Sequence, residues 1–433
     1  MTTPEPLPSA TLHSEVFLHA VAELGARQSL RTSQAIYNAQ GVMLLGDGAR
    51  VDQGLYERLV SHRLSAPLDE CVEADASVTG AVLRESAEAA LQRWPFFAQM
   101  GQPVRVRAML LEAVAGIALP KPIALHLTVM RHGKPALFEH SVLMGLLCAH
   151  LVREGGGMQH DMGLAASAGV LHDIGMLHID PALLDSGDPL SGDALKPLYV
   201  HPLTASMVMG RFSDYPKEVL RAVVEHHERL DGSGYPRGLA ADAMSPLGRV
   251  LSLAEVVTAM FDGERRHPEQ RVSILLRINP RRYDAPGVAE IHRLLAGVEP
   301  GAADDIVAEA SIARLVRLAG ALGSWRTASE QLRDGLGGAH QALVRSMDEQ
   351  NATLQRMLYD AGVTAEQLAL LAADGGMEDT PLRVELWALA EELLWQLHAA
   401  ANQLKRRWQA AEPGMPYPAA LADWFAAVEA LDS

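Results

Sequence analysis

The sequence predicts a mainly α-helical protein with a small α+β region near its N-terminus. Helical periods dominate the chain after Pro122, where apolar residues recur three or four positions apart. A strand-like pattern occurs at Ala35–Gly48, where two short apolar runs are separated by a polar turn that contains Gly41. That arrangement predicts a β-hairpin. The fold class is therefore expected to be a helical core with a small α+β accessory part.

The composition predicts a soluble cytoplasmic protein. The 433 residues are 48% hydrophobic and 21% charged, which is ordinary for a globular chain. A net charge of −16 argues against broad binding to nucleic acid or to an anionic membrane. Cys71 and Cys148 are too few for a disulfide scaffold. The most hydrophobic stretch, Ala108–Met130, is interrupted by charged residues and prolines, so no membrane span is expected.

Changes in composition suggest three segments. Residues 12–120 are expected to form the small α+β accessory domain, and residues 124–297 a helical core domain. Residues 303–433 are rich in Ala, Leu, Glu and Gln with helical periods, and predict a helical region of unknown role. Its long amphipathic helices are compatible with a homodimer.

Histidines at regular intervals are the chemically informative feature of the core segment. His140, the pair His172-Asp173, His201 and the pair His226-His227 follow one another at intervals of 25 to 32 residues. Each interval is about one helical hairpin, so a stacked α-helical fold would bring the imidazoles to a common point. His201 precedes Pro202 and is expected at a helix start. Imidazole and carboxylate ligands suit a transition metal such as Fe, Mn, Zn or Ni.

The motifs around these histidines resemble the HD-GYP family of the HD phosphohydrolase superfamily. The resemblance is carried by His172-Asp173-Ile-Gly175, by His201-Pro202 and by the eleven residues His226-His-Glu-Arg-Leu-Asp-Gly-Ser-Gly-Tyr-Pro236. Glu139–Val142 is similar to the first histidine helix of the family, and Gly248–Ala259 to its last ligand helix. The resemblance covers about 40% of the chain.

The resemblance implies an all-α HD-type bundle around a metal site that hydrolyses cyclic di-GMP to pGpG or GMP. Asp173 and His172 are expected to be catalytic, with Asp173 the bridge between two divalent ions, for which Fe or Mn is expected. The expected metal ligands are His140, His172, Asp173, His201, His226, His227 and Glu255. The expected substrate-binding residues are Tyr235, which could also pack on a protein partner, and the basic residues Arg237, Arg265 and Arg266.

Four positions depart from the family pattern. Met176 replaces a common lysine, which removes a cation that could hold substrate phosphate. Glu255 and Thr258 stand where aspartates are usual, and Glu255 carries an extra methylene. Ala136 stands where family members with three metals place a glutamate, so two metals are expected.

Three functions remain open at this point. The first is a cyclic di-GMP phosphodiesterase. The second is a degenerate HD-GYP domain that binds metal or cyclic di-GMP and signals through protein partners without turnover, which Met176, Glu255 and Thr258 favour. The third is an HD phosphohydrolase that acts on another nucleotide, which the Gly-Tyr-Pro stretch makes less attractive.

Overall fold

The structure is a computed structural model, and it contains two compact units. It describes residues 15–51, 59, 62–180, 196–263, 266–298, 308–332, 336–361, 363, 380–412 and 414–432. The first unit comprises Met1–Ser186, Lys196–Glu264 and Arg281–Val298, and the second comprises Gly187–Leu195, Arg265–Pro280 and Glu299–Ser433. The accessory segment thus lies in the first unit together with the core segment, except that Gly187–Leu195 and Arg265–Pro280 of the core segment belong to the second unit. The domain boundaries drawn from composition remain predictions.

The N-terminal part of the first unit is the α+β region. It contains α1 (Glu15–Arg27), β1 (Leu30–Thr32), β2 (Ile36–Tyr37), β3 (Met43–Leu45), α3 (Leu68–Cys71) and β4 (Val72–Ala74). Strands β2 and β3 pair antiparallel around Gly41, whose φ of +80° favours glycine, so the predicted hairpin is confirmed. Strand β1 pairs antiparallel with β4, a contact that the sequence pattern did not predict.

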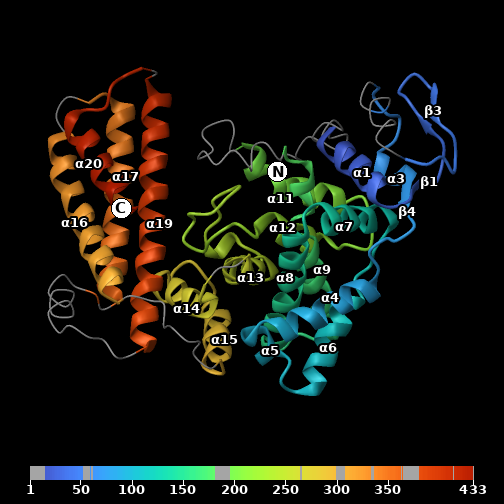
Figure 1. The fold of residues 1–433 in the computed structure, drawn as a ribbon, viewed down its shortest axis with the longest axis horizontal. Helices are drawn as coiled ribbons and strands as arrows, with labels where there is room; N and C mark the ends of the chain where they lie inside the picture. Colours follow the sequence, from blue (N-terminus) through green and yellow to red (C-terminus); the bar gives the residue numbers. More distant parts are fainter. Residues whose placement is uncertain are drawn as a thin grey trace. The chain divides into compact units, whose positions relative to one another are not determined.

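The rest of the first unit is a helical bundle (Figure 1). Its α-helices are α4 (Gly80–Arg93), α5 (Pro95–Met100), α6 (Val104–Ala115), α7 (Lys121–Gly133), α8 (Pro135–Glu154), α9 (Gln159–Leu171), α11 (Lys196–Met209), α12 (Lys217–Glu225), α13 (Pro246–Thr258) and α15 (Ala285–Ala296). The 3₁₀ helices are η2 (Ile174–His178), η4 (Ala241–Ala243) and η5 (Ala259–Phe261). The mainly α-helical fold class is therefore confirmed.

Helices α8 and α9 form the centre of this bundle. Gly145 and Gly169 allow them to pack closely, because a Cβ atom on Gly169 would lie 2.8 Å from the Cα atom of Gly145. Helix α8 is long and apolar enough to cross a membrane, but 72% of its most apolar window is buried inside the fold. It is a core helix that carries His140 into the interior.

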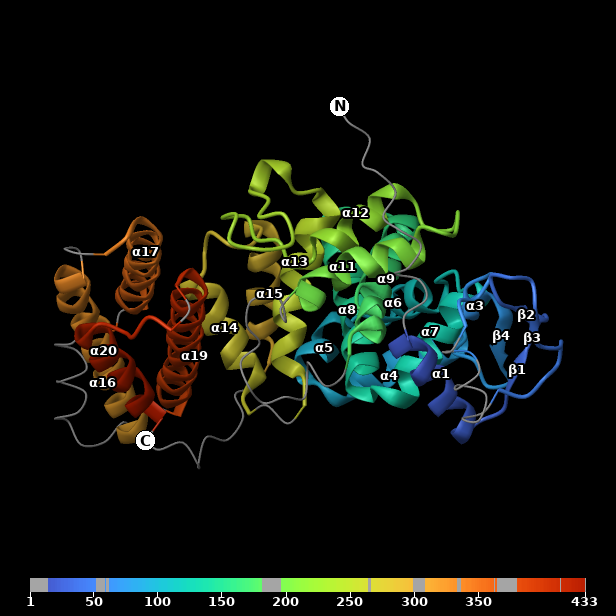
Figure 2. The same cartoon turned by 90° about the horizontal axis from the view of Figure 1, so that it is seen from above.

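The second unit consists of α14 (Pro268–Ile278), α16 (Ala308–Leu332), α17 (Gly338–Asp360), α19 (Thr380–Ala411), α20 (Ala419–Glu429) and the 3₁₀ helix η6 (Ala430–Asp432). Helices α16, α17 and α19 lie side by side in both views (Figures 1 and 2). Trp325 and Trp424 pack at 4.7 Å between ring centroids in their shared core. The indole of Trp325 donates to Asp348 at 2.8 Å, which satisfies its buried polar atom. The helical character predicted for this region is confirmed.

Candidate metal centre

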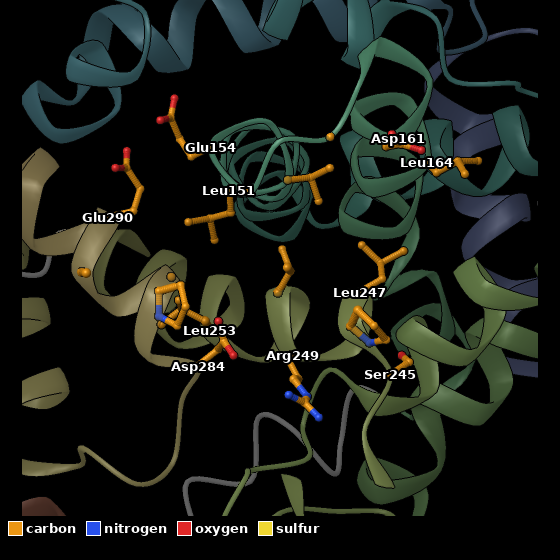
Figure 3. Close-up of a pocket in the computed structure, with 18 of the residues that line it drawn as sticks. Leu151, Glu154, Asp161, Leu164, Ser245, Leu247, Arg249, Leu253, Asp284 and Glu290 are labelled. Atoms are coloured by element: carbon orange, nitrogen blue, oxygen red, sulfur yellow. The ribbon is translucent and has the colours of Figure 1, made fainter. Parts of the chain in front are cut away.

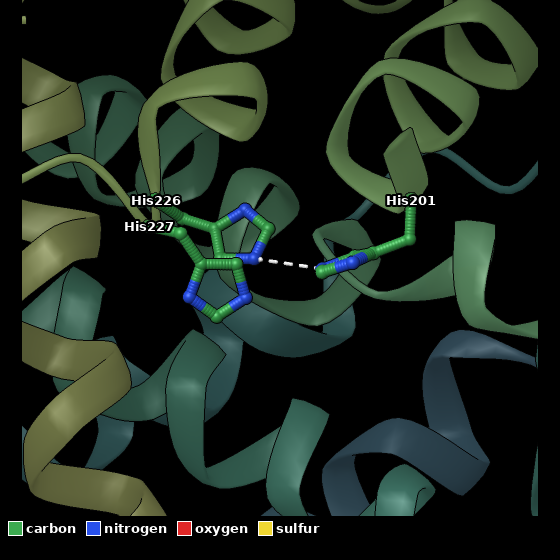
Figure 4. A group of neighbouring side chains, drawn as sticks. All are labelled: His201, His226 and His227. Carbon is green, nitrogen blue, oxygen red and sulfur yellow. Dashed lines mark hydrogen bonds between the residues drawn. The ribbon is translucent and has the colours of Figure 1, made fainter. Parts of the chain in front are cut away.

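The structure brings the seven predicted ligand side chains to one place in the first unit. Helix α8 supplies His140, the end of α9 supplies His172 and Asp173, and α11 supplies His201. His226 and His227 follow α12, and Glu255 lies on α13. Their ligand atoms fall into groups whose members all lie within 4.8 Å of one another, namely His201–His226–His227, His140–His172–Glu255 and His172–Asp173–His226. Figure 4 shows His201 facing the adjacent rings of His226 and His227.

Two of these imidazoles are oriented by the ends of their own helices. The last carbonyl groups of an α-helix lack partners within the helix. His172 follows α9 and its Nδ1 atom donates to the carbonyl oxygen of Gly169 at 2.7 Å. His226 follows α12 and its Nδ1 atom donates to the carbonyl oxygen of Val223 at 2.6 Å. Because a carbonyl oxygen only accepts, each Nδ1 carries the proton and each Nε2 faces the centre.

His201 reaches the same orientation by a different route. It lies inside α11 and not at a helix start, so that expectation was wrong. Pro202, the next residue, has no N–H, which would leave the carbonyl group of Leu198 without its helical donor. The Nδ1 atom of His201 donates to that carbonyl oxygen instead. The proline is tolerated inside the helix because the histidine uses the group that the proline releases.

The nitrogen atoms that converge at this centre would be stabilised by a bound cation. The Nε2 atoms of His201 and His226 are 3.2 Å apart (Figure 4). In neutral imidazoles held by Nδ1, both Nε2 atoms are acceptors and cannot bond to each other. His172 Nε2 and Asp173 Oδ1 are also buried without a hydrogen-bond partner. Orphaned buried acceptors are costly. The donor set therefore fits a bound divalent metal, with each imidazole held by a second hydrogen bond as metal-binding histidines usually are.

Asp173 lies between the histidines. Its Oδ1 atom is 3.0 Å from His201 Nε2 and 3.7 Å from His226 Nε2, and its Oδ2 atom is 3.4 Å from His172 Nε2. Burial raises the pKa of Asp173, but the nearby His172 and His201 outweigh burial and hold that pKa well below its usual value. A carboxylate with one oxygen facing each side is suited to contact two cations.

Glu255 reaches the centre despite its extra methylene. Its Oε2 atom is 3.2 Å from His140 Nε2 and 3.3 Å from His172 Nε2. Burial raises the pKa of Glu255, but His140 and His172 reverse the shift and lower it well below its usual value. Thr258 takes no part in this cluster, because its hydroxyl donates to the Ala254 carbonyl of its own helix at 2.8 Å.

The titration behaviour of the histidines divides the centre into two sides. Burial lowers the pKa of His140 and of His172, but the carboxylates beside them prevail, raising the first well above its usual value and the second to about 9. Burial, together with neighbouring imidazoles, lowers the pKa of His226 well below its usual value, and burial lowers that of His227 to about 3. The carboxylates thus favour positive charge beside Glu255, where a metal ion would replace the protons on His140 and His172. The imidazoles of His226 and His227 are already neutral and can ligate without losing a proton.

The Gly-Tyr-Pro loop closes one side of the centre. The Tyr235 ring stacks on the His227 ring with 4.5 Å between their centroids. The Tyr199 ring also contacts Tyr235, with 4.5 Å between those two centroids. A Cβ atom on Gly234 would overlap the backbone of His227 and Glu228, so a glycine is required there. The Tyr235–Pro236 peptide bond is cis.

Several residues that support the centre were missed from the sequence. The buried Glu228 carboxylate accepts from the backbone N–H groups of Arg237 and Leu239 at 2.7 and 2.8 Å, which fixes the loop. The buried Glu225 carboxylate accepts from Ser245 at the start of α13. Asp262 Oδ1 lies 3.1 Å from His140 Nδ1 and orients that ring. Glu225 and Glu228 adjoin the histidine pair, so their position was a usable signal, whereas Asp262 had none.

The structure describes two of the three arginines that were predicted to bind substrate phosphate, together with Met176. Arg237 is exposed at the end of the loop, where its backbone is held by Glu228. Arg266 is exposed and belongs to the second unit. Arg265 lies outside the described residues. Met176 is half-buried on η2, and its backbone N–H donates to the Asp173 carbonyl at 2.9 Å. Their roles toward a substrate stay predictions.

Comparison with known proteins gives the site a context. Residues 129–286 match the HD domain family. A 3′3′-cGAMP-specific phosphodiesterase of Vibrio cholerae is 34% identical over 127 residues, which are 28% of each chain. A cyclic di-GMP phosphodiesterase of Pseudomonas aeruginosa is 28% identical over 183 residues, covering 42% of this chain and 44% of the relative. These matches span less than half of the relatives' length.

One solved structure is similar at low identity. It is an HD-GYP-type protein from Bdellovibrio bacteriovorus, with 15% sequence identity and a TM-score of 0.34. The alignment covers 61% of this chain and 95% of that one.

Proposed function

Because residues 129–286 form an HD domain of the HD-GYP family, we propose that this chain is a metal-dependent phosphodiesterase that hydrolyses a cyclic dinucleotide. The observation that carries the proposal is the convergence of five imidazoles and two carboxylates, with Asp173 at their centre. The relatives that match the domain bear the names of cyclic dinucleotide phosphodiesterases. We further propose that the protein works in the cytoplasm.

Two divalent ions are proposed, with Fe and Mn the preferred candidates. His201, His226 and His227 would hold one ion, His140, His172 and Glu255 the other, and Asp173 would contact both. Ala136 offers no ligand for a third ion. When bound, such a pair supplies Lewis-acid activation of water and of a phosphodiester.

The residues of this chain have distinct tasks in that reaction. Carbonyl groups at Gly169, Leu198 and Val223 fix the histidine tautomers, so the ligand lone pairs need no reorganisation. Tyr235 covers His227 and offers its ring edge and hydroxyl beside the centre, where it could contact a nucleobase or a protein partner. Arg237, Arg265 and Arg266 remain the candidates for contacts with substrate phosphates.

A second candidate is a domain that binds metal and nucleotide but signals without turnover. The observation that favours it is Met176, which places an uncharged side chain three residues after Asp173. A methionine cannot donate a hydrogen bond to phosphate or neutralise its charge. The phosphodiesterase is supported more strongly, because all seven candidate ligand side chains are retained.

Chromatographic detection of products tests the proposal. The purified chain is reconstituted anaerobically with Fe(II) or Mn(II) and incubated separately with cyclic di-GMP and with 3′3′-cGAMP. Asp173→Ala is the inactive control, and Asp242→Asn, an exposed carboxylate-to-amide change, is the matched control. Linear dinucleotide or mononucleotide that forms with the wild type and with Asp242→Asn, but not with Asp173→Ala, supports the phosphodiesterase. Absence of product from protein that holds two metals supports the signalling alternative.

A further inference from the structure

A cavity lies in the first unit, between α8, α9, α13 and α15. Its volume is about 800 Å³. Figure 3 shows Leu151, Leu247 and Leu253 facing this space from α8 and α13. Pockets for small molecules have volumes of roughly 300 to 1,000 Å³ and mostly apolar walls with a few polar groups. The cavity has the size and the walls of a ligand site.

The charge at the edge of this cavity selects the ligand. Its lining contains five carboxylates, from Glu154, Asp161, Glu218, Asp284 and Glu290, and two guanidinium groups, from Arg249 and Arg293. Arg293 is held by Glu290 at 2.6 and 2.7 Å, and Arg249 donates to the Ala241 carbonyl at 2.6 Å. The excess of negative charge repels a nucleotide and attracts a cation. This cavity is therefore unsuited to a second molecule of the anionic substrate.

His150 fixes the position of Glu290, one of the carboxylates that line the cavity. It is 2% exposed, its Nε2 atom lies 2.6 Å from Glu290 Oε1, and its Nδ1 atom is buried without a hydrogen-bond partner. Glu290 is thereby held in place between His150 and Arg293. Glu154 and Glu290 point to the same edge of the cavity in Figure 3. Glu154 is paired with Arg153 and Glu290 with Arg293. A cationic head group would therefore meet the charge of Asp161, Glu218 and Asp284 while its apolar part meets the leucines.

Two walls of the cavity are the helices that carry metal ligands. Helix α8 contributes Leu151 to the cavity and His140 to the metal centre. Helix α13 contributes Val250 and Leu253 to the cavity and Glu255 to the metal centre. The His140 and Glu255 side chains are only 3.2 Å apart, so a small shift of one helix against the other alters that pair. A molecule bound between α8 and α13 would therefore change the positions of the metal-ligating side chains on these two helices.

We propose that this cavity is a regulatory site for a small amphiphilic cation, a molecule with an apolar body and one ammonium-type head. Its occupation changes the relative position of α8 and α13 and thereby the metal affinity of the centre. The regulatory part rests on the proposed metal centre, whereas binding of the cation does not. The two parts are therefore measured separately.

Calorimetry on the metal-free full chain tests binding. The probe is decyltrimethylammonium, used below its micelle concentration, with decanol and decanoate as controls of equal chain length. We expect the cation to bind about tenfold more tightly than decanol and decanoate to bind most weakly. Equal binding of all three, or no binding of the cation, overturns the proposed ligand class.

Variants test the location. Ala289 is exposed and lines the cavity, so Ala289→Trp places an indole in it without disturbing the core, and the cation should bind at least about tenfold more weakly. The double variant Glu218→Gln/Asp284→Asn should bind about fivefold more weakly, since partly exposed charge pairs are individually weak. Glu85→Gln/Asp242→Asn removes the same charge at exposed positions outside the cavity and should bind as the wild type does. Equal effects of both double variants would mean that net charge, and not this cavity, attracts the probe.

Metal affinity tests the regulatory part. The dissociation constant for Mn(II) is measured with and without saturating probe, in the wild type and in Ala289→Trp. A change of about fivefold or more in the wild type alone supports the proposal, because linked sites alter each other's affinity reciprocally. Tight binding of the probe with an unchanged Mn(II) affinity overturns regulation while leaving both the cation site and the phosphodiesterase proposal standing.

Discussion

Gly175 packs so closely against His201 that a Cβ atom on residue 175 would overlap the His201 carbonyl oxygen and lie 2.9 Å from the Ala205 backbone nitrogen. This contact joins η2 to α11 directly beside the centre. It allows Asp173, two residues earlier, to approach His201 Nε2 at 3.0 Å. The glycine of the His-Asp-Ile-Gly motif therefore has a steric role in forming the metal centre.

Replacing Gly175 with alanine should separate η2 from α11 and weaken metal binding. We expect Gly175→Ala to lower Mn(II) affinity about tenfold or more, in the range seen when support of a metal ligand is lost. Gly163→Ala is the matched control, because a Cβ atom there meets nothing within 4 Å and alanine favours a helix. Calorimetric titration with Mn(II) measures both. Equal affinities in the two variants would contradict the steric role.

Asp262 should affect metal binding through His140. Its Oδ1 atom lies 3.1 Å from His140 Nδ1, so it holds the ring with Nε2 toward Glu255. Because the Asp262 side chain is 40% exposed, we expect Asp262→Asn to weaken metal binding by about tenfold, at the lower end of the usual range. Metal titration of Asp262→Asn against Asp242→Asn checks this. An effect on thermal stability without any change in metal affinity would show that Asp262 does not position His140.

Met176 provides a test of the missing phosphate contact. Met176→Lys adds a cation on η2, three residues after Asp173. If the lost cation limits turnover, kcat should rise with little change in metal content, since Lys can hold phosphate as a point charge. Met158→Lys adds the same charge at a side chain that is 75% exposed and serves as the control. An unchanged or lower rate in Met176→Lys counts against this explanation of the departure.

His178 should make the stability of the metal-free protein depend on pH. Burial, and then the neighbouring His126 and Arg211, lower the pKa of His178 to about 3 in the folded chain. In the unfolded chain the pKa of that residue is about 6.5. Its contribution to the unfolding free energy is therefore complete above pH 6.5 and is lost as the pH falls toward 3. Lowering the pH from 7 to 5 should therefore reduce the unfolding free energy by about 2 kcal/mol through this residue.

Urea denaturation of the wild type and of His178→Phe, both metal-free, measures that contribution. The phenylalanine keeps an aromatic ring beside Phe17, which stacks on His178 at 5.0 Å. The loss of stability between pH 7 and pH 5 should be smaller in the variant by about 2 kcal/mol. Identical pH dependence in the two proteins would show that His178 takes up no additional proton on unfolding.

The ligand set could be predicted from the sequence because each histidine lies in a local motif. The pairs His172-Asp173 and His226-His227 follow apolar helices, where the final carbonyl groups orient a ring. The position of His201 could not be predicted correctly. Proline usually marks a helix start, and only the bond from His201 to Leu198 explains why Pro202 is tolerated inside α11.

Contacts between distant segments were not predictable. Strands β1 and β4 are only three residues long, and they pair residues as far apart in the sequence as Leu30 and Ala74. No local sequence pattern therefore predicts them. The β2–β3 hairpin was predictable because its turn contains Gly41. Asp262 contacts His140 across 122 positions, and Glu255 replaces a shorter acid. Whether Glu255 reached the centre depended on packing of α13 that the sequence does not specify.

Metal content measured by mass spectrometry on the reconstituted chain tests the metal centre most directly. The account predicts two ions per chain in the wild type and in Asp242→Asn, and none in Asp173→Ala, because Asp173 is the carboxylate proposed to contact both ions. Circular dichroism of Asp173→Ala establishes that the variant is folded. A folded Asp173→Ala protein that retains two ions would contradict the bridging role of Asp173, and a wild type that binds none would contradict the metal centre itself.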